Sequence, residues 1–408
     1  MAVADNTLTP LLPVPGVRLA AVTAGIKQTQ RADLVLMELP ESAVTAAVFT
    51  RNAFCAAPVL LAKEHLQRSD NKVRYLLINA GNANAGTGVT GLEDARRTTQ
   101  AVAEIASCEA EAVLPFSTGV IGEALPVDKI EAVLPEAYRA LDARAWPDAA
   151  AGIMTTDTRP KGCSRTFVID DKEYVITGIA KGAGMVRPNM ATMLAYIATD
   201  MAVEQTLLQG ILDEAIEKSF NRITVDGDTS TNDACVFVAT GLADAKPMTA
   251  EQTERAKQFQ DVVEEICIHL AQSLVRDGEG ASKFVTVTVN GGLGERECLD
   301  VAYTIAHSPL VKTALFASDP NWGRLLAAIG RSGLDDLDVD LVDLYLNDVL
   351  IAAKGARAQH YSEEQGVAAM APEDITIRIE LNRGDHTASV WTTDLSYDYV
   401  KINAEYRT

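Results

Sequence analysis

Thr192 stands at a position in this sequence that suits a nucleophile. It follows a segment rich in glycine and proline, residues 181–191, and precedes the apolar run of residues 193–198. Glycine and proline favour a loop, whereas a run that is apolar on both faces is typical of a strand buried on both sides. A hydroxyl at this junction would be held by the core behind it and open in front, which suits a nucleophile. The alternative is an ordinary threonine at the start of a strand.

The pair Thr118-Gly119 could stabilise the negative charge that such a nucleophile creates. A threonine followed by glycine offers a hydroxyl and an unhindered backbone N–H side by side, and two such donors can form an oxyanion hole. The alternative for Ser117, Thr118 and Gly119 is a turn from a strand into a helix, with a capping hydroxyl.

Three further polar segments could contribute to a site. Residues 155–158, Thr-Thr-Asp-Thr, precede a proline and predict a solvated turn. Residues 226–233 contain two acids two apart, but the spacing of a calcium-binding EF-hand loop fails, so no metal is expected. Glu279 lies between two glycines after the longest predicted helix. An acid is unfavourable at the C-terminal end of a helix, which favours a functional role for Glu279.

The glycine-rich segment after a predicted strand at 73–79 matches a dinucleotide-binding pattern only superficially. Gly86, Gly88 and Gly91 have the spacing GxGxxG, but they start late after the strand, and no acid ends the next strand. A polar turn near the site is the preferred interpretation, with nucleotide binding as the alternative. The sequence has no CxxC, GxSxG or HExxH motif.

The predicted elements alternate between strands and helices, which indicates an α/β protein with two or three lobes. Strands are expected at 34–37, 44–49, 73–79, 113–116, 165–169, 174–179, 193–198, 283–289 and 375–381. Helices are expected at 58–66, 93–105, 127–141, 207–220 and 249–275, the last beginning with a capping box of Thr249 and Gln252.

The composition disfavours polyanionic partners. The 408 residues carry a net charge of −20, which repels nucleic acid and anionic membranes, so a small anionic substrate needs a local cation. The six cysteines form no disulfide pattern, and neither a signal peptide nor a membrane helix is expected, so we predict a cytoplasmic protein.

The motif Lys-Gly-Ala-Gly-Met-Val-Arg-Pro-Asn-Met-Ala-Thr-Met-Leu at 181–194 resembles the self-cleavage segment of the glutamate N-acetyltransferase family, also called ornithine acetyltransferases. Similar family motifs extend the resemblance from about residue 16 to the last residue. They lie at residues 81–85, 117–120, 155–158, 226–233, 277–281 and at the C-terminal Thr408.

The resemblance implies an arginine-biosynthesis acyltransferase with a layered α/β fold of the N-terminal-nucleophile type and two lobes. Cleavage between Ala191 and Thr192 would give an alpha chain, 1–191, and a beta chain, 192–408, which associate as α2β2. Thr192 would accept the acetyl group of N2-acetylornithine and pass it to glutamate, with Thr118 and Gly119 as the oxyanion hole. The substrate-binding residues implied are Thr155, Lys181, Thr192, Glu279, Asn403 and Thr408.

Several points stay open at this stage. The choice among Thr155, Thr156 and Thr158 is not fixed, and neither is the use of acetyl-CoA as a second donor; no other cofactor is expected. One rival function is a self-processing amidase or aminopeptidase with the same nucleophile. A second rival is a non-catalytic nucleotide- or metabolite-binding protein.

Overall fold

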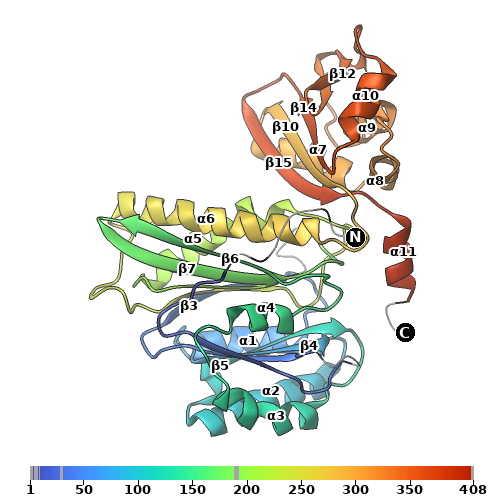
Figure 1. Ribbon diagram of the computed structural model, residues 1–408. Coiled ribbons are helices and arrows are strands. Elements are labelled where there is room, and N and C mark those ends of the chain that lie inside the picture. The colour runs from blue at the N-terminus through green and yellow to red at the C-terminus, as the bar shows by residue number, and fades with distance from the viewer. Residues whose placement is uncertain (1–2, 4–7, 9, 28–30, 188–192, 406–408) are drawn as a thin grey trace. The chain divides into compact units, whose positions relative to one another are not determined.

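The computed structural model (Figure 1) describes residue 3, residue 8 and residues 10–27, 31–187 and 193–405. The chain divides into two compact units. The larger unit comprises Asn6–Asn221 and Asp228–Leu274, and the smaller unit comprises Met1–Asp5, Arg222–Gly227 and Val275–Thr408.

The larger unit contains two sheets and six helices among its described residues. The sheets have the strand orders β1-β2-β4-β5 and β3-β9-β8-β7-β6. Its elements are β1 (Arg18–Val22), β2 (Leu34–Glu38), β3 (Val44–Phe49), α1 (Ala57–Arg68), β4 (Tyr75–Asn82), α2 (Gly88–Ala106), β5 (Val113–Val120), α3 (Val127–Arg139), α4 (Trp146–Gly152), β6 (Lys161–Ile169), β7 (Lys172–Lys181), β8 (Leu194–Thr199), α5 (Gln205–Lys218), β9 (Ala234–Ala239) and most of α6 (Thr253–Arg276).

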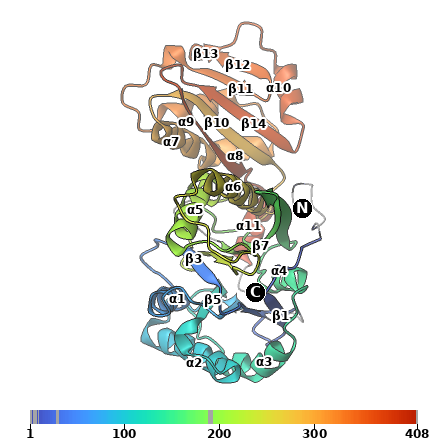
Figure 2. The same cartoon turned by 90° about the vertical axis from the view of Figure 1, so that its left-hand side faces the viewer.

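Alternating apolar side chains explain why these two sheets stack face to face. In β4, Leu76 and Ile78 join a core that also contains Leu194 and Tyr196 of β8, whereas Leu77 points to the opposite core beneath α2 and α3. Successive side chains of a strand point to opposite faces, so a strand that is apolar throughout must be covered on both sides. The result is a layered arrangement, with α2 and α3 outside one sheet and α5 and α6 outside the other (Figures 1 and 2).

Strand β8 confirms the sequence-based prediction for the apolar run. All six of its residues are buried, and it pairs antiparallel with β7 and parallel with β9. The other predicted strands and helices of this unit are also present, with their ends shifted by a few residues.

One boundary prediction was wrong. Helix α6 begins at Thr253, not at Thr249, because only half of the predicted capping box forms. The Gln252 side chain accepts a hydrogen bond from the Thr249 backbone N–H at 3.1 Å, which closes a turn ahead of the helix.

The smaller unit is a mixed sheet with helices, in the strand order β13-β12-β11-β14-β10-β15. Its sheet and helices share one core, centred on the valines of β10 and the isoleucines of β14. The elements are β10 (Phe284–Gly292), α7 (Glu295–Ala306), α8 (Pro309–Phe316), α9 (Trp322–Gly330), β11 (Asp343–Leu346), β12 (Val349–Ala353), β13 (Ala356–Arg357), α10 (Glu363–Met370), β14 (Asp374–Glu380), β15 (His386–Thr393) and α11 (Tyr397–Ala404).

Candidate active site

Lys181 contacts two other predicted site residues in the larger unit. It is the last residue of β7 and is only 7% exposed. Its Nζ donates to Thr155 Oγ1 at 2.8 Å and to Thr118 Oγ1 at 3.1 Å. Among the three threonines left open by the sequence, Thr155 is therefore the one whose hydroxyl contacts this ammonium group.

Thr118 and Gly119 lie within a strand and not in the turn that was the alternative. Strand β5 continues through Val120 and pairs parallel with β4, which sets Gly119 opposite Gly81. Gly119 has a φ of +134°, and a Cβ on it would lie 2.3 Å from the Gly81 carbonyl carbon. No other residue fits this position without moving β4, so the backbone beside Thr118 is held firmly.

The Asp157 carboxylate holds both Lys181 and the turn that contains Thr155 in place. This buried carboxylate accepts the backbone N–H of Thr155 at 2.9 Å and of Gly182 at 2.7 Å. It also accepts from Lys161 Nζ at 2.5 Å and lies 4.0 Å from Lys181 Nζ. One side chain thus ties the turn to the first residue of β6 and to the end of β7.

The charges around Asp157 favour its ionised form. Burial would by itself raise the pKa of Asp157, but Lys161 and Lys181, together with the hydrogen bonds from Lys161 and Thr155, outweigh burial and hold the pKa well below its usual range. The sequence analysis placed Asp157 in a solvated turn and assigned no role to Lys161. The sequence signal for this ion pair was the spacing, because Lys161 follows Asp157 by four residues and precedes a predicted strand.

A network of buried amides supports the Thr118 segment from behind. Asn232 Nδ2 donates to the Ser117 carbonyl at 2.9 Å and to the Ala83 carbonyl at 2.6 Å. The Ser117 hydroxyl donates to Asn79 Oδ1 at 2.6 Å. Through Asn232, the polar segment 226–233 therefore supports the strand that carries Thr118.

Gly91, the last glycine of the GxGxxG pattern, has a structural explanation. Helix α2 already begins at Gly88, and a Cβ on Gly91 would lie 1.8 Å from Thr87 Oγ1 and 2.5 Å from Asn84 Oδ1. Asn84 Nδ2 also donates to the Gly91 carbonyl at 2.8 Å. The absence of a side chain at Gly91 allows the asparagine turn to pack closely against the first turn of the helix.

Glu279 and Asn403, both in the smaller unit, contact each other. Asn403 Nδ2, on α11, donates to Glu279 Oε2 at 2.7 Å. The following glycine, Gly280, has a φ of +68°, and a Cβ there would lie 2.5 Å from both Ser396 Oγ and Tyr399 N. Helix α11 therefore packs against the loop that carries Glu279.

Three predicted residues, Ala191, Thr192 and Thr408, lie outside the described part of the chain. Met193 is the first described residue after the predicted cleavage point, and it directly precedes Leu194, which pairs with Lys181 across β7 and β8. The described chain therefore comes within one residue of the predicted nucleophile beside the strand that ends at Lys181.

Within 10–27, 31–187 and 193–405, no helix combines the length and apolar character that a membrane span requires. In the same part of the chain, His, Cys, Asp and Glu side chains nowhere gather in a group of three that could hold a metal ion.

The comparison with protein families shows which family the chain belongs to. The model of the ArgJ family matches residues 18–408, nearly the whole chain. The chain belongs to the ArgJ family.

Curated ArgJ relatives are similar along their full length. The chain is 58% identical over 408 residues to the arginine biosynthesis bifunctional proteins ArgJ of Pseudomonas syringae pv. tomato and of Pseudomonas fluorescens, covering 100% of each chain. It is 53% identical over 398 residues to that of Methylococcus capsulatus, covering 98% of this chain and 97% of the relative. The predicted membership of an arginine-biosynthesis acyltransferase family is confirmed.

Solved ArgJ-type structures match parts of the chain. The crystal structure of the arginine biosynthesis bifunctional protein from Bacillus halodurans is 39% identical, with a TM-score of 0.50, and covers 53% of this chain and 100% of its own. An ornithine acetyltransferase structure from Mycobacterium tuberculosis, complexed with ornithine, is 34% identical, with a TM-score of 0.38, and covers 43% of this chain and 93% of its own. The predicted layered α/β fold is confirmed.

Proposed function

We propose that this chain cleaves itself between Ala191 and Thr192 and then transfers an acetyl group from N2-acetylornithine to glutamate through an acetyl-Thr192 intermediate. The observation that carries the proposal is the contact of Lys181 with Thr118 and Thr155 at the level where β8 begins. A cation, two hydroxyls and a rigid glycine backbone meet where Lys181 pairs with Leu194, which follows the predicted nucleophile by two positions in the sequence. Membership of the ArgJ family supports the reaction class.

Self-cleavage needs only the backbone and the Thr192 hydroxyl. Its oxygen attacks the carbonyl carbon of Ala191, the C–N bond breaks, and the nitrogen takes the hydroxyl proton, which leaves an ester. The α-amine of Thr192 is already free at this point, and water then hydrolyses the ester, which frees the carboxylate of Ala191 and restores the hydroxyl of Thr192. This amine has an ordinary pKa of about 7.7–8.0, so it is partly neutral at pH 7 and can act as the base for its own hydroxyl.

Acetyl transfer then proceeds in two half-reactions. Thr192 Oγ attacks the acetyl carbonyl of N2-acetylornithine, ornithine leaves after taking a proton on its α-nitrogen, and an acetyl ester remains on Thr192. The amine of glutamate attacks this ester and restores the hydroxyl. The Thr118 hydroxyl and the Gly119 N–H are the proposed donors to the oxyanion in both steps.

The charged residues are assigned by complementarity to the substrates. Lys181, held by Asp157 and Thr155, would bind the α-carboxylate that acetylornithine and glutamate share. Glu279, with Asn403 and Thr408, would bind the side-chain amine of ornithine. The reaction as written needs no metal and no cofactor, and acetyl-CoA would serve only as an alternative donor.

The position of the cut explains how two pieces could stay together. It falls inside the larger unit, between strands β7 and β8, which pair with each other along six residue positions. The Bacillus halodurans chain matches 53% of this chain over its whole length, and residues 192–408 are 217 of 408, also about 53%. Two such cleaved pairs would form the α2β2 assembly.

An acetyl-transfer assay tests the function. Purified protein is given N2-acetylornithine with or without glutamate, and N-acetylglutamate, ornithine and acetate are measured. We expect N-acetylglutamate and ornithine in equal amounts, with ping-pong kinetics. Free acetate formed at the same rate without glutamate would favour the amidase, and the absence of any acetyl chemistry would favour a binding protein.

The oxyanion hole is tested by Gly119→Ala. The added Cβ would collide with the Gly81 backbone and displace the N–H of residue 119. Loss of one oxyanion donor typically lowers kcat by about 10²–10³-fold, which we expect here without an equal rise in KM. Gly88→Ala is the matched control, because a Cβ there meets no atom within 4 Å although its φ of +62° is also positive. Equal losses in both variants would contradict the assignment.

A further inference from the structure

Lys27 is a second lysine beside the Lys181 cluster, and the sequence analysis assigned it no role. Its Nζ donates to the Met154 carbonyl at 2.6 Å. Met154 directly precedes Thr155, whose hydroxyl contacts Lys181. Two lysines that are 154 positions apart in sequence therefore contact two adjacent residues, Met154 and Thr155.

The backbone around Lys27 is built to hold this side chain in place. The Asp33 carboxylate is completely buried and accepts the N–H groups of Ala24 at 2.6 Å, Ile26 at 2.7 Å and Lys27 at 3.0 Å. The three hydrogen bonds that the Asp33 carboxylate accepts fix the turn that carries Lys27. The entropy cost of positioning the ammonium group is thereby reduced before any ligand arrives.

The aliphatic part of the Lys27 side chain lies against Gly81, whose backbone pairs with Gly119. A Cβ on Gly81 would lie 2.9 Å from Lys27 Cγ, and Gly81 is the residue that pairs with Gly119. The absence of a side chain at Gly81 is thus what allows the lysine to approach β4. Lys27 therefore lies against the end of β4, and Lys181 contacts Thr118 on the neighbouring strand β5.

Among the described residues, this cluster brings the lysines Lys27, Lys161 and Lys181 near two acids, Asp33 and Asp157. Burial lowers the pKa of Lys27, and the positive charge of Lys181 lowers it further, while Asp33 and Asp157 oppose the shift. Asp157 already pairs with Lys161 at 2.5 Å, and Asp33 already accepts three backbone N–H groups. In a protein with a net charge of −20, two lysines that contact the adjacent residues Met154 and Thr155 favour the binding of an anionic ligand.

We propose that Lys27 provides a second ammonium group, beside Lys181, for the α-carboxylate of the acetyl donor and of the acetyl acceptor. This inference rests on the proposed function. A carboxylate has two oxygens with about four lone-pair directions, so it accepts hydrogen bonds from two ammonium groups at once. An ammonium group has three protons, and the Met154 carbonyl takes one of those of Lys27.

The test compares substrates that have the α-carboxylate with analogues that lack it. The donors are N2-acetylornithine and N-acetylputrescine, and the acceptors are glutamate and 4-aminobutanoate. In Lys27→Met we expect KM for N2-acetylornithine and for glutamate to rise about tenfold, with kcat nearly unchanged. The two decarboxylated analogues should be affected less than twofold. If an analogue reacts too slowly, its inhibition constant replaces KM.

Two variants keep the test decisive. Lys27→Arg retains the charge and should retain most of the preference for the carboxylated substrates. Lys129→Met is the matched control, because Lys129 Nζ also donates to a carbonyl of the same turn, Gly25, at 2.6 Å, but from an exposed position. It should leave every KM unchanged.

The outcomes distinguish a failure of the proposed role of Lys27 from a failure of the proposed function. An equal loss with carboxylated and decarboxylated substrates in Lys27→Met would overturn the proposal, because Lys27 would then only hold the Met154 segment. A wild-type protein that forms N-acetylglutamate, combined with a normal KM in Lys27→Met, would overturn the role of Lys27 alone. A wild-type protein with no acetyl transfer would overturn the proposed function, and this inference with it.

Discussion

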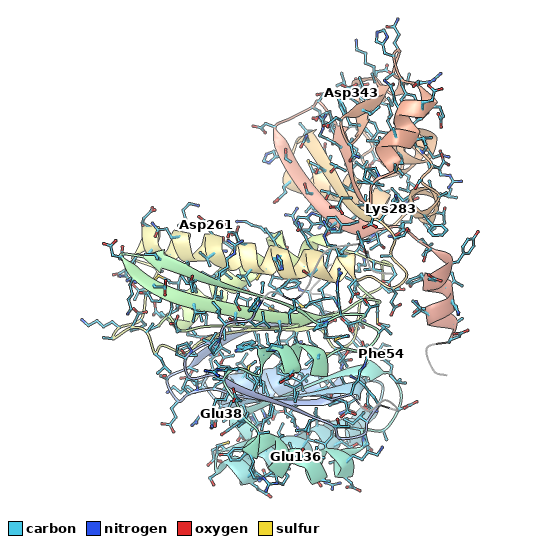
Figure 3. The ribbon with its side chains drawn as sticks, viewed as in Figure 1. Glu38, Phe54, Glu136, Asp261, Lys283 and Asp343 are labelled. Carbon is cyan, nitrogen blue, oxygen red and sulfur yellow. The ribbon has the colours of Figure 1, made fainter. Side chains whose placement is uncertain are left out.

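Lys181 in the larger unit and Lys283 in the smaller unit are equally buried, each 7% exposed, but their ammonium groups have different partners. Lys181 donates to two threonine hydroxyls and lies near one carboxylate. Lys283, labelled in Figure 3, donates to the carbonyls of Met370, Ala371 and Pro372 at 3.0, 3.2 and 2.8 Å.

These partners imply different roles for the same residue type. The three carbonyls bonded by Lys283 lie at and after the end of helix α10, where backbone acceptors would otherwise lack donors, so Lys283 caps a helix. Hydroxyl groups can rotate and exchange partners when a ligand binds, whereas carbonyls at a helix end cannot. Burial alone therefore does not distinguish a binding lysine from a structural one, and the chemical nature of its acceptors does.

The largest expected effect is a loss of stability on substitution of Asp157, whose negative charge offsets the positive charges of Lys161 and Lys181. In Asp157→Asn, Lys161 and Lys181 would stay buried without their shared negative charge, and breaking a buried pair of this kind costs about 3–5 kcal/mol. We expect a corresponding fall in the urea midpoint at pH 7. Asp244→Asn is the control, because its partner Lys172 is 44% exposed at its side chain, and it should cost clearly less.

The same variant has a defined pH dependence. The folded protein holds the pKa of Asp157 well below the ordinary value of about 3.9. The ionised carboxylate therefore stabilises the fold fully at pH values above about 3.9, and this stabilisation is lost as the pH falls through the lower, folded-state pKa. The difference in stability between wild type and Asp157→Asn should therefore be constant between pH 5 and 7 and shrink below about pH 4. A constant difference down to pH 2 would contradict the account.

Lys312 in the smaller unit extends the comparison to a buried lysine with mixed partners. Its Nζ donates to Thr392 Oγ1 at 3.0 Å, to Thr393 Oγ1 at 3.3 Å and to the Thr393 carbonyl. Burial lowers the pKa of Lys312 to about 8, against the opposing charges of Asp394 and Asp226. An unfolded chain has a lysine pKa of about 10.4, so it binds more protons than the folded chain between these values.

Stability should therefore rise with pH between about 8 and 10.4, by up to about 3 kcal/mol from this residue. The measurement is the urea midpoint of wild type and of Lys312→Met, followed by the fluorescence of Trp391, which precedes Thr392. Every other titrating group is common to both proteins, so the difference isolates Lys312. Parallel curves across this range would show that its charge is not suppressed by burial.

The smallest effect tests the comparison of Lys181 with Lys283 most specifically. Lys181→Met should raise KM for N2-acetylornithine about tenfold, because a charge-assisted hydrogen bond to the substrate is lost. Lys283→Met should leave KM unchanged and lower stability by about 1–3 kcal/mol, because helix-end carbonyls lose their donors. The reverse pattern would show that the nature of the acceptors does not predict the role of a buried lysine.

The sequence predicted those features that local pattern determines. The doubly buried strand β8 followed from residues that are apolar on both faces, and the resemblance indicated Thr118, Thr155 and Lys181, which the structure brings together. The pairing of Glu279 with Asn403 also agrees with the resemblance. The assignments to Ala191, Thr192 and Thr408 stay predictions.

The features that the sequence did not reveal depend on contacts between distant segments. Lys27 meets Met154 across 127 positions, and Asn232 meets Ser117 across 115. Asp157 looked like part of a solvated turn because the strand ends that bury it are assembled only by the sheet. No periodicity within a segment encodes such contacts.

The chemical state of residue 192 in the purified, active protein tests the central claim most directly. Intact mass and N-terminal sequencing should reveal two pieces of about 20 and 23 kDa from the 43.6 kDa chain, the larger beginning with a free α-amine on Thr192. In Thr192→Ala we expect a single uncut chain without acetyl transfer. A fully active wild-type protein in which residue 192 is still joined to Ala191 would contradict the account.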